Sequence, residues 1–182
     1  MIRARHPGEL SSQDKIKRMI RVNHAGEYGA KRIYAGQIAV LGNTDKGDML
    51  RHMYEQECQH LEGFETLIHT HNVRPTFLSP VWHVAGYALG AGTALMGPNA
   101  AMACTVAVEE VIDAHYAAQE DTLKEDPEAQ GLYEMVKRYR AEELEHRDIG
   151  LAHGAEQTPG YTVLTSLIKA GSRLAIWLST RV

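Results

Sequence analysis

The sequence has few cysteines and no excess of positive charge, and each scarcity excludes a class of protein. Its 182 residues include only two cysteines, Cys58 and Cys104, which fall on different predicted helices. This excludes a disulfide-stapled scaffold; two free thiols in a reducing compartment are expected, with a single disulfide as the alternative. The formal net charge of -4 at pH 7, without a basic stripe, argues against a nucleic-acid-binding protein.

Long hydrophobic runs and nucleotide-binding motifs are also missing. No segment reaches the roughly 20 uninterrupted apolar residues that a membrane-spanning helix needs. Residues 1–9 are polar and have no apolar signal core, so we expect neither a secretory signal nor a transit peptide there. No G-x-G-x-x-G motif follows a predicted strand, and a flavin or dinucleotide fold is therefore not expected.

Helical periodicity fills the rest of the chain, with almost no strand-like alternation. Four long helices are predicted, over residues 12–41, 45–71, 99–124 and 127–153. Ser11 and Asp14 resemble a capping box at the first start, and Gly42 is a typical helix stop. Pro127 occupies a favoured first helical position.

The connections between these helices predict the topology. The first and second helices are joined by a few residues, as are the third and fourth, so each pair is expected to be an antiparallel hairpin. A connection of about 27 residues separates the hairpins, long enough to cross over along a bundle. We therefore predict an all-α fold with one domain over residues 1–182, a ferritin-like four-helix bundle built from a duplicated helical hairpin.

Two apolar segments lie outside the four helices, a crossover helix at about residues 81–97 and a C-terminal helix at about residues 161–182. Each is too short to span a bilayer but can lie in its interface, with Trp82 and Trp177 at headgroup depth. The alternative is that the two segments pack on each other and on the bundle.

Two Glu-x-x-His steps, Glu57–His60 and Glu143–His146, suggest a metal site. Glu27 precedes the first step by 30 residues, and Glu109 precedes the second by 34. Glutamates on long helices are usually solvated, but matching positions in both hairpins favour ligands for two transition metals, iron or manganese rather than zinc. The predicted ligand set is Glu27, Glu57, His60, Glu109, Glu143 and His146.

Neighbouring residues are assigned supporting roles. Metal-bound imidazoles usually donate their outer N–H to an acceptor, and Asp113 and Asp148 are the candidate acceptors. His115 and Tyr116, six and seven residues after Glu109, are candidate catalytic residues that line the pocket and move protons or electrons. Tyr28 and Tyr34 are expected in the core, each with a hydrogen-bonded hydroxyl.

Four stretches together resemble one known family. They are RVNHAGEYGAKRIYAGQ (residues 21–37), LGAGTALMG (89–97), AMACTVAVEE (101–110) and EELEHRDIGLAH (142–153). They are similar to the demethoxyubiquinone hydroxylases of ubiquinone biosynthesis, the Coq7 family. The resemblance extends from about residue 14 onward, and the family's metal ligands fall on the six positions above.

The resemblance implies a di-iron monooxygenase with two carboxylate-bridged Fe ions per chain. It implies that O2 is the co-substrate, NADH the reductant and a polyprenyl demethoxyubiquinone or its quinol the substrate. It also implies a peripheral membrane protein in contact with membrane lipid, and it allows a homo-oligomer. The location would be the cytoplasmic face of a bacterial inner membrane, favoured by the polar first residues. In a eukaryote it would be the matrix side of the mitochondrial inner membrane, with a Coq9-like lipid-binding partner.

Two other classes of function remain as alternatives. A ferritin-like iron-storage protein would share the ligands but act on no organic substrate. A helical interaction module would carry the same acids as solvated side chains. The apolar segments argue against a storage cage.

Overall fold

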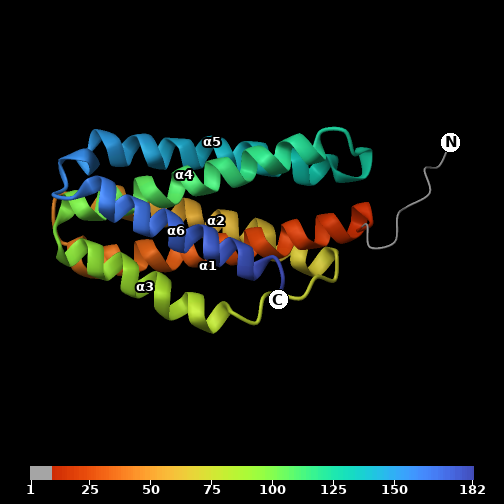
Figure 1. Ribbon diagram of the computed structural model, residues 1–182, viewed down its shortest axis with the longest axis horizontal. Coiled ribbons are helices and arrows are strands. Elements are labelled where there is room, and N and C mark those ends of the chain that lie inside the picture. Colours follow the sequence, from red (N-terminus) through yellow and green to blue (C-terminus); the bar gives the residue numbers. More distant parts are fainter. Residues whose placement is uncertain (1–9) are drawn as a thin grey trace.

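The described part of the chain is helical throughout, as the sequence predicts. The computed structural model describes residues 10–182 (Figure 1), so the predictions for residues 1–9 fall outside it. Within residues 10–182 there are six α-helices, two short 3₁₀ turns and no strand. The elements are α1 (Ser12–Leu41), α2 (Gly47–Thr70), α3 (Ser79–Leu95), α4 (Pro98–Leu123), η1 (Pro127–Ala129), α5 (Gln130–Ala152), η2 (Ala155–Gln157) and α6 (Tyr161–Ser179).

The signals at the helix ends act much as predicted, with one exception. The Asp14 amide donates to Ser11 Oγ at 2.9 Å and the Ser11 amide donates to the Asp14 carboxylate at 3.4 Å, which completes the capping box of α1. The fourth long helix, however, does not begin at Pro127. Because the Asp126 carboxylate accepts from the Glu128 amide at 3.0 Å, Pro127 opens the tight turn η1 and α5 follows it.

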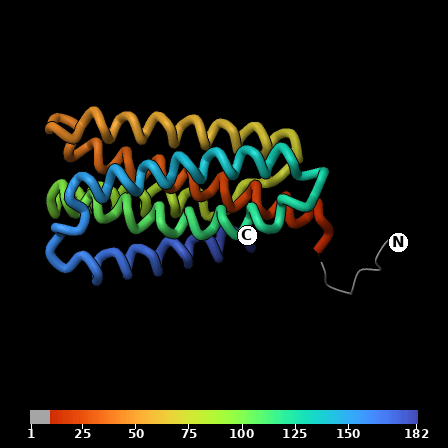
Figure 2. The backbone as a smooth tube through the Cα atoms, turned by 90° about the horizontal axis from the view of Figure 1, so that it is seen from above, coloured from red at the N-terminus to blue at the C-terminus, as the bar shows by residue number. Residues whose placement is uncertain are grey.

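The long helices form two antiparallel pairs, α1 with α2 and α4 with α5 (Figures 1 and 2). After α2 the chain crosses over through α3, which runs parallel to α1 and leads into α4. After α5 the chain turns again, and α6 lies against α4. The crossover and C-terminal helices therefore cover the same side of the four long helices.

Of the three apolar clusters among the described residues, two lie on either side of the bundle's middle. One contains Ile20 of α1, Phe64 of α2 and Val136 of α5. The other contains Leu50 of α2 and Met102 of α4. The predicted metal ligands lie between these clusters along each helix, so the folding of the apolar core brings them to one level.

Glycine allows α3 to approach α1 at backbone distance. A Cβ atom on Gly90 would overlap the carbonyl oxygen of Ile33, and one on Gly36 would overlap that of Tyr87. Any larger residue at these two positions would separate the helices. Close packing here fixes α3 along α1.

Exposed apolar side chains gather on α3 and α6, the two segments that the sequence predicts to be apolar helices. Val84 and Leu95 of α3 are 66% and 76% exposed, and Val163 and Trp177 of α6 are 66% and 51% exposed. Among the described residues, no helix combines the length and apolar character needed to cross a membrane.

Candidate metal centre

The six predicted ligands meet at the middle of the bundle, and each is at most 3% exposed. Since residues three apart share a helix face, both members of each Glu-x-x-His step point inward. The ligand atoms form two overlapping groups, with the atoms of a group within 4.8 Å of one another. The groups are Glu27, Glu57, His60 and Glu143, and Glu57, Glu109, Glu143 and His146.

Each lone glutamate accepts a hydrogen bond from a tyrosine of the other hairpin. Tyr34 donates to Glu109 Oε1 at 2.8 Å, and Tyr116 donates to Glu27 Oε1. Burial first, and then the neighbouring glutamates, raise the pKa of both tyrosines well above the ordinary value. The hydroxyls therefore stay protonated as donors, and the expectation of a buried, hydrogen-bonded Tyr34 is confirmed. Tyr28 has a partner, His83 Nδ1 at 2.6 Å, but is only partly buried, so the expectation of a core position is wrong for it.

Both histidines turn Nδ1 toward the carboxylates and Nε2 away from them. His60 Nδ1 is 3.0 Å from Glu143 Oε1, and its Nε2 is 2.6 Å from Glu142 Oε2. His146 Nδ1 is 3.2 Å from Glu143 Oε2, and its Nε2 is 2.9 Å from Gln56 Oε1. The outer acceptors, Glu142 and Gln56, hold the two rings so that Nδ1 faces the centre.

The prediction that Asp113 and Asp148 accept these outer N–H groups is wrong. Asp113 pairs with Arg140 at 2.6 Å, and Asp148 pairs with Arg147 at 2.6 Å. Both aspartates were predicted because each follows a ligand on its own helix, Glu109 on α4 and His146 on α5, whereas the true acceptors come from the helix that faces each histidine.

Burial and mutual repulsion control the charges at the centre. Burial and the Glu143 carboxylate raise the pKa of Glu57 and of Glu109. Burial would raise the pKa of Glu143 too, but its close contacts with His146 and His60 outweigh burial and lower that pKa to about 2. For both histidines burial lowers the pKa, but contacts with Glu143, joined by Glu27 for His60 and by Glu109 for His146, more than offset burial and raise the pKa. Glu143 is thus the carboxylate most strongly held in its charged form.

Several ligand atoms at the centre have no hydrogen-bond partner among the described residues. They are both carboxylate oxygens of Glu57, Glu109 Oε2, Glu143 Oε2 and His146 Nδ1. A buried polar atom left unsatisfied costs on the order of 1–3 kcal/mol. Cations would satisfy these atoms, and two divalent ions would balance the four carboxylates. An oxygen-rich set with one imidazole for each ion suits iron or manganese, so the residues fit a pair of such metals.

The two predicted catalytic residues lie at different distances from the centre. Tyr116 reaches it through its bond to Glu27. His115 does not touch a ligand: its Nε2 lies 3.1 Å from Asn23 Oδ1 and 2.8 Å from Gln119 Nε2. Burial lowers the pKa of His115 to about 4, so the ring is neutral near pH 7.

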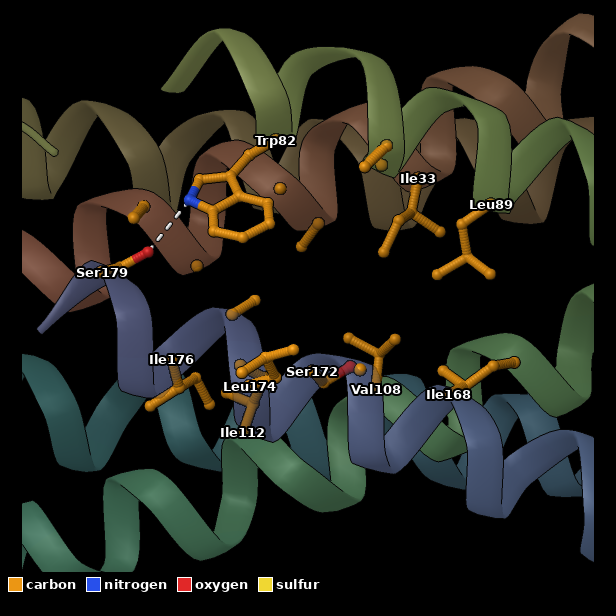
Figure 3. A pocket seen from close by; sticks show the side chains of 18 of the residues that line it. Ile33, Trp82, Leu89, Val108, Ile112, Ile168, Ser172, Leu174, Ile176 and Ser179 are labelled. Atoms are coloured by element: carbon orange, nitrogen blue, oxygen red, sulfur yellow. Dashed lines mark hydrogen bonds between the residues drawn. The ribbon is translucent and has the colours of Figure 1, made fainter. Parts of the chain in front are cut away.

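An apolar cavity of about 610 Å³ lies between α1, α3, α4 and α6 (Figure 3). Gly26 and Ala30 line it on α1, and Val108 and Ile112 line it on α4. These four residues flank Glu27 and Glu109 in sequence, so the cavity reaches the helical turns that carry both lone glutamates. At one end Trp82 Nε1 of α3 donates to Ser179 Oγ of α6 at 2.9 Å and links the two covering helices.

Comparison with known proteins assigns the family. Residues 14–179 match the family model described as "Ubiquinone biosynthesis protein COQ7". The chain belongs to this family. The match includes all six predicted ligands and all the described helices except the first two residues of α1.

Members with established names are similar over nearly the whole chain. The "NADPH-dependent 3-demethoxyubiquinone 3-hydroxylase, mitochondrial" of Homo sapiens is 57% identical over 173 residues, which cover 94% of this chain and 80% of that protein. The "3-demethoxyubiquinol 3-hydroxylase" of Rhodospirillum rubrum is 54% identical over 179 residues, 98% of this chain and 84% of that protein. The "5-demethoxyubiquinone hydroxylase, mitochondrial" of Saccharomyces cerevisiae is 40% identical over 182 residues, 92% of this chain and 78% of that protein.

The sequence interpretation of this COQ7 family member missed several polar residues around the centre. Neither Gln56 nor Glu142 is among the acceptors that the sequence analysis predicts. Each directly precedes the glutamate of a Glu-x-x-His step, so a comparison of the duplicated hairpins would have paired them. The buried contact between Asn23 and Gln119, 2.8 Å from Nδ2 to Oε1, has no such local signal because it joins distant helices.

Proposed function

We propose that this chain hydroxylates the ring of a polyprenyl demethoxyubiquinone or demethoxyubiquinol at a di-iron centre. The observation that carries the proposal is the buried cluster of four glutamates and two histidines, with unsatisfied ligand atoms, beside an apolar cavity. The family supports the same activity, because its members from human, R. rubrum and yeast are named as hydroxylases of this substrate.

The ligands divide into shared and separate ones. Glu57 and Glu143 belong to both groups of ligand atoms and would help to hold both ions. Glu27 with His60 would hold one ion, and Glu109 with His146 the other. Two iron ions held by these residues would supply the activation of dioxygen. The arrangement of two antiparallel hairpins with a long crossover supports a ferritin-like di-iron bundle.

The cavity supplies the position of the organic substrate. Its apolar lining matches an isoprenoid tail, and its walls at Gly26 and Val108 adjoin the turns of Glu27 and Glu109. A ring bound at that wall would lie next to the centre and away from water. We assign Tyr116 the role of holding Glu27 through its hydroxyl proton, and neutral His115 that of a hydrogen-bonding neighbour of Asn23 and Gln119.

The proposed reductant is a nicotinamide nucleotide. The sequence analysis named NADH alone, and NADPH is now added as a candidate. The resemblance implied NADH, whereas the name of the human relative specifies NADPH. Both nucleotides therefore belong in any assay of this chain.

The exposed apolar faces of α3 and α6 support peripheral attachment to a membrane. Arginines stand over aromatic rings at the edges of these faces: Arg74 lies 3.9 Å from the ring centre of Phe77, and Arg181 lies 3.9 Å from that of Trp177. Such pairs suit the boundary between acyl chains and charged headgroups. A membrane-bound substrate would then reach the cavity between α3 and α6 directly from the lipid.

Replacement of Glu143 tests the metal assignment. Because Glu143 is shared by both groups of ligand atoms, Glu143→Ala should abolish iron binding and hydroxylation together, measured by metal analysis and by product formation. Glu145→Ala, at an exposed position on the same helix, is the matched control and should retain both. Full activity of the Glu143→Ala variant, with native helical content, would overturn the assignment.

A further inference from the structure

The two halves of the metal centre are related position by position. In each half a tyrosine follows the lone glutamate by seven residues, Tyr34 after Glu27 and Tyr116 after Glu109, and it bonds to the lone glutamate of the other half. We call the pair Glu27 and His60 the Glu27 half-site.

Its counterpart, the pair Glu109 and His146, is the Glu109 half-site. The correspondence also includes the outer acceptors of the histidines. The residue before Glu143 bonds to His60 Nε2, and the residue before Glu57 bonds to His146 Nε2.

The two halves carry different residue types at the position of the outer acceptor. The acceptor for His60 is the carboxylate of Glu142, at 2.6 Å, whereas the acceptor for His146 is the amide oxygen of Gln56, at 2.9 Å. Both donors are ring nitrogens of fully buried histidines, and both acceptors are partly exposed. The difference is therefore one of acceptor charge at equivalent places.

Acceptor charge changes the imidazole as a ligand. A hydrogen bond to a carboxylate is shorter and stronger than one to a neutral amide. It draws the Nε2 proton away from the ring and makes Nδ1 a stronger electron donor to a cation. The full negative charge of Glu142 also lies on the side of the Glu27 half-site.

The surroundings of the two imidazole rings also differ, and again His60 of the Glu27 half-site has the additional contact. His60 stacks on Tyr139, with ring centres 4.1 Å apart. Tyr139 precedes Glu143 by four residues, and the equivalent position before Glu57 is Met53. An aromatic platform thus fixes the orientation of His60, and the duplicated position in the other half carries no ring.

We propose that the two metal positions are inequivalent, and that Glu142 is a positioning residue which makes the Glu27 half-site bind its divalent ion first and more tightly. The inference rests on the proposed di-metal function and deepens it. Because Gln56 is a neutral acceptor, the ion at the Glu109 half-site is bound more weakly and exchanges more readily.

Titration of the metal-free protein with Mn²⁺ tests this inference without any measurement of turnover. Calorimetry should resolve two steps in the wild type, separated by at least about tenfold in affinity, the scale on which such outer partners act. Electron paramagnetic resonance should report an isolated ion after the first equivalent and a coupled pair after the second. Anomalous scattering from crystals with one equivalent should locate the ion at Glu27 and His60.

Two reciprocal variants distinguish acceptor charge from a merely structural role. Glu142→Gln should weaken the first step by about tenfold or more and bring the two affinities together. Gln56→Glu should strengthen the second step and leave the first almost unchanged. A structural role would weaken binding in both variants, so that result would overturn the inference.

The remaining outcomes separate this inference from the proposed function. Two equal steps in the wild type, a single cooperative step, or a first ion at Glu109 and His146 would refute the inequivalence and leave the di-metal centre intact. A wild-type protein that binds no Mn²⁺ and no Fe²⁺ would overturn the proposed function as well.

Discussion

Individual side chains at the centre are held by partners from other helices. Tyr34 and Tyr116 each cross the bundle to bond a glutamate, while Glu142 and Gln56 each cross it to bond a histidine. The buried acids are therefore oriented before any metal arrives. Such preorganisation reduces the conformational entropy lost when a metal or substrate binds.

His115 offers a test of this residue-scale account through pH. Burial lowers its pKa from 6.5 to about 4 in the folded state. Between these values the unfolded chain binds the proton and the folded chain does not. The stabilising contribution of neutral His115 is therefore complete above pH 6.5 and is lost as the pH falls toward 4.

The measurement is the difference in free energy of unfolding between the wild type and His115→Gln, taken from urea curves at pH 7 and pH 4.5. We expect the wild type to lose more stability than the variant over this range, by at most about 3 kcal/mol for a shift of this size. The raised pKa values of Glu57 and Glu109 act in the opposite direction, but they are common to both proteins and cancel. Equal losses would show that His115 is not held neutral.

Sequence reasoning at this scale succeeded where helical spacing decides the outcome. The Glu-x-x-His steps project inward because residues three apart share a face, and the six predicted ligands do come together. It failed for Asp113 and Asp148, which turn to nearby arginines. The choice between partners on the same helix and on a facing helix depends on helix rotation, which one helix's sequence does not specify.

At the scale of the elements, the contact between α3 and α1 shapes the cavity. Gly90 of α3 lies against the Ile33 carbonyl, whereas Gly92, two residues later, has no atom within 4 Å of an added Cβ. Alanine at Gly90 therefore tests the contact, and alanine at Gly92 on the same helix is the control.

We expect Gly90→Ala to push α3 from α1 and to lower the free energy of unfolding by about 1–3 kcal/mol, the usual cost of overpacking. Gly92→Ala should be neutral, or stabilising by up to about 1 kcal/mol because alanine favours helix. Thermal unfolding of both variants measures the difference. Equal melting temperatures would contradict the close approach.

The presence of the helices was predictable from hydrophobic periodicity, whereas the residues at which they begin were harder to predict. The capping box of Ser11 and Asp14 is local and was predicted correctly. The start of α5 was not, because Pro127 is equally compatible with an α-helix and with the 3₁₀ turn that Asp126 stabilises. The pairing of α3 with α1 was not predicted, since it depends on glycines that meet only in the folded chain.

At the scale of the whole molecule, the face formed by α3 and α6 predicts membrane attachment. Val84, Val163 and Trp177 are all more than half exposed, and none of them lines the cavity. Each large apolar side chain gains roughly 1.5–3 kcal/mol when it leaves water. Replacement of all three by Asp should therefore reduce binding to liposomes by well over tenfold.

Cosedimentation with liposomes measures this effect, and Leu151→Asp on α5 provides the control. Leu151 is an exposed apolar residue outside the two covering helices, so its replacement should leave binding unchanged. If the triple variant binds liposomes as the wild type does, this face is not the attachment surface.

The most direct test of the central claim is the mass of the product formed with oxygen-18 gas. Iron-loaded protein would be incubated with short-tailed demethoxyubiquinone and the labelled gas, in parallel with NADPH and with NADH. We predict a hydroxylated ring that carries one heavy oxygen, with formation lost in Glu143→Ala. Unlabelled product, or no product with either nucleotide from protein that holds two irons, would contradict the assignment of this chain as an iron-dependent demethoxyubiquinone hydroxylase.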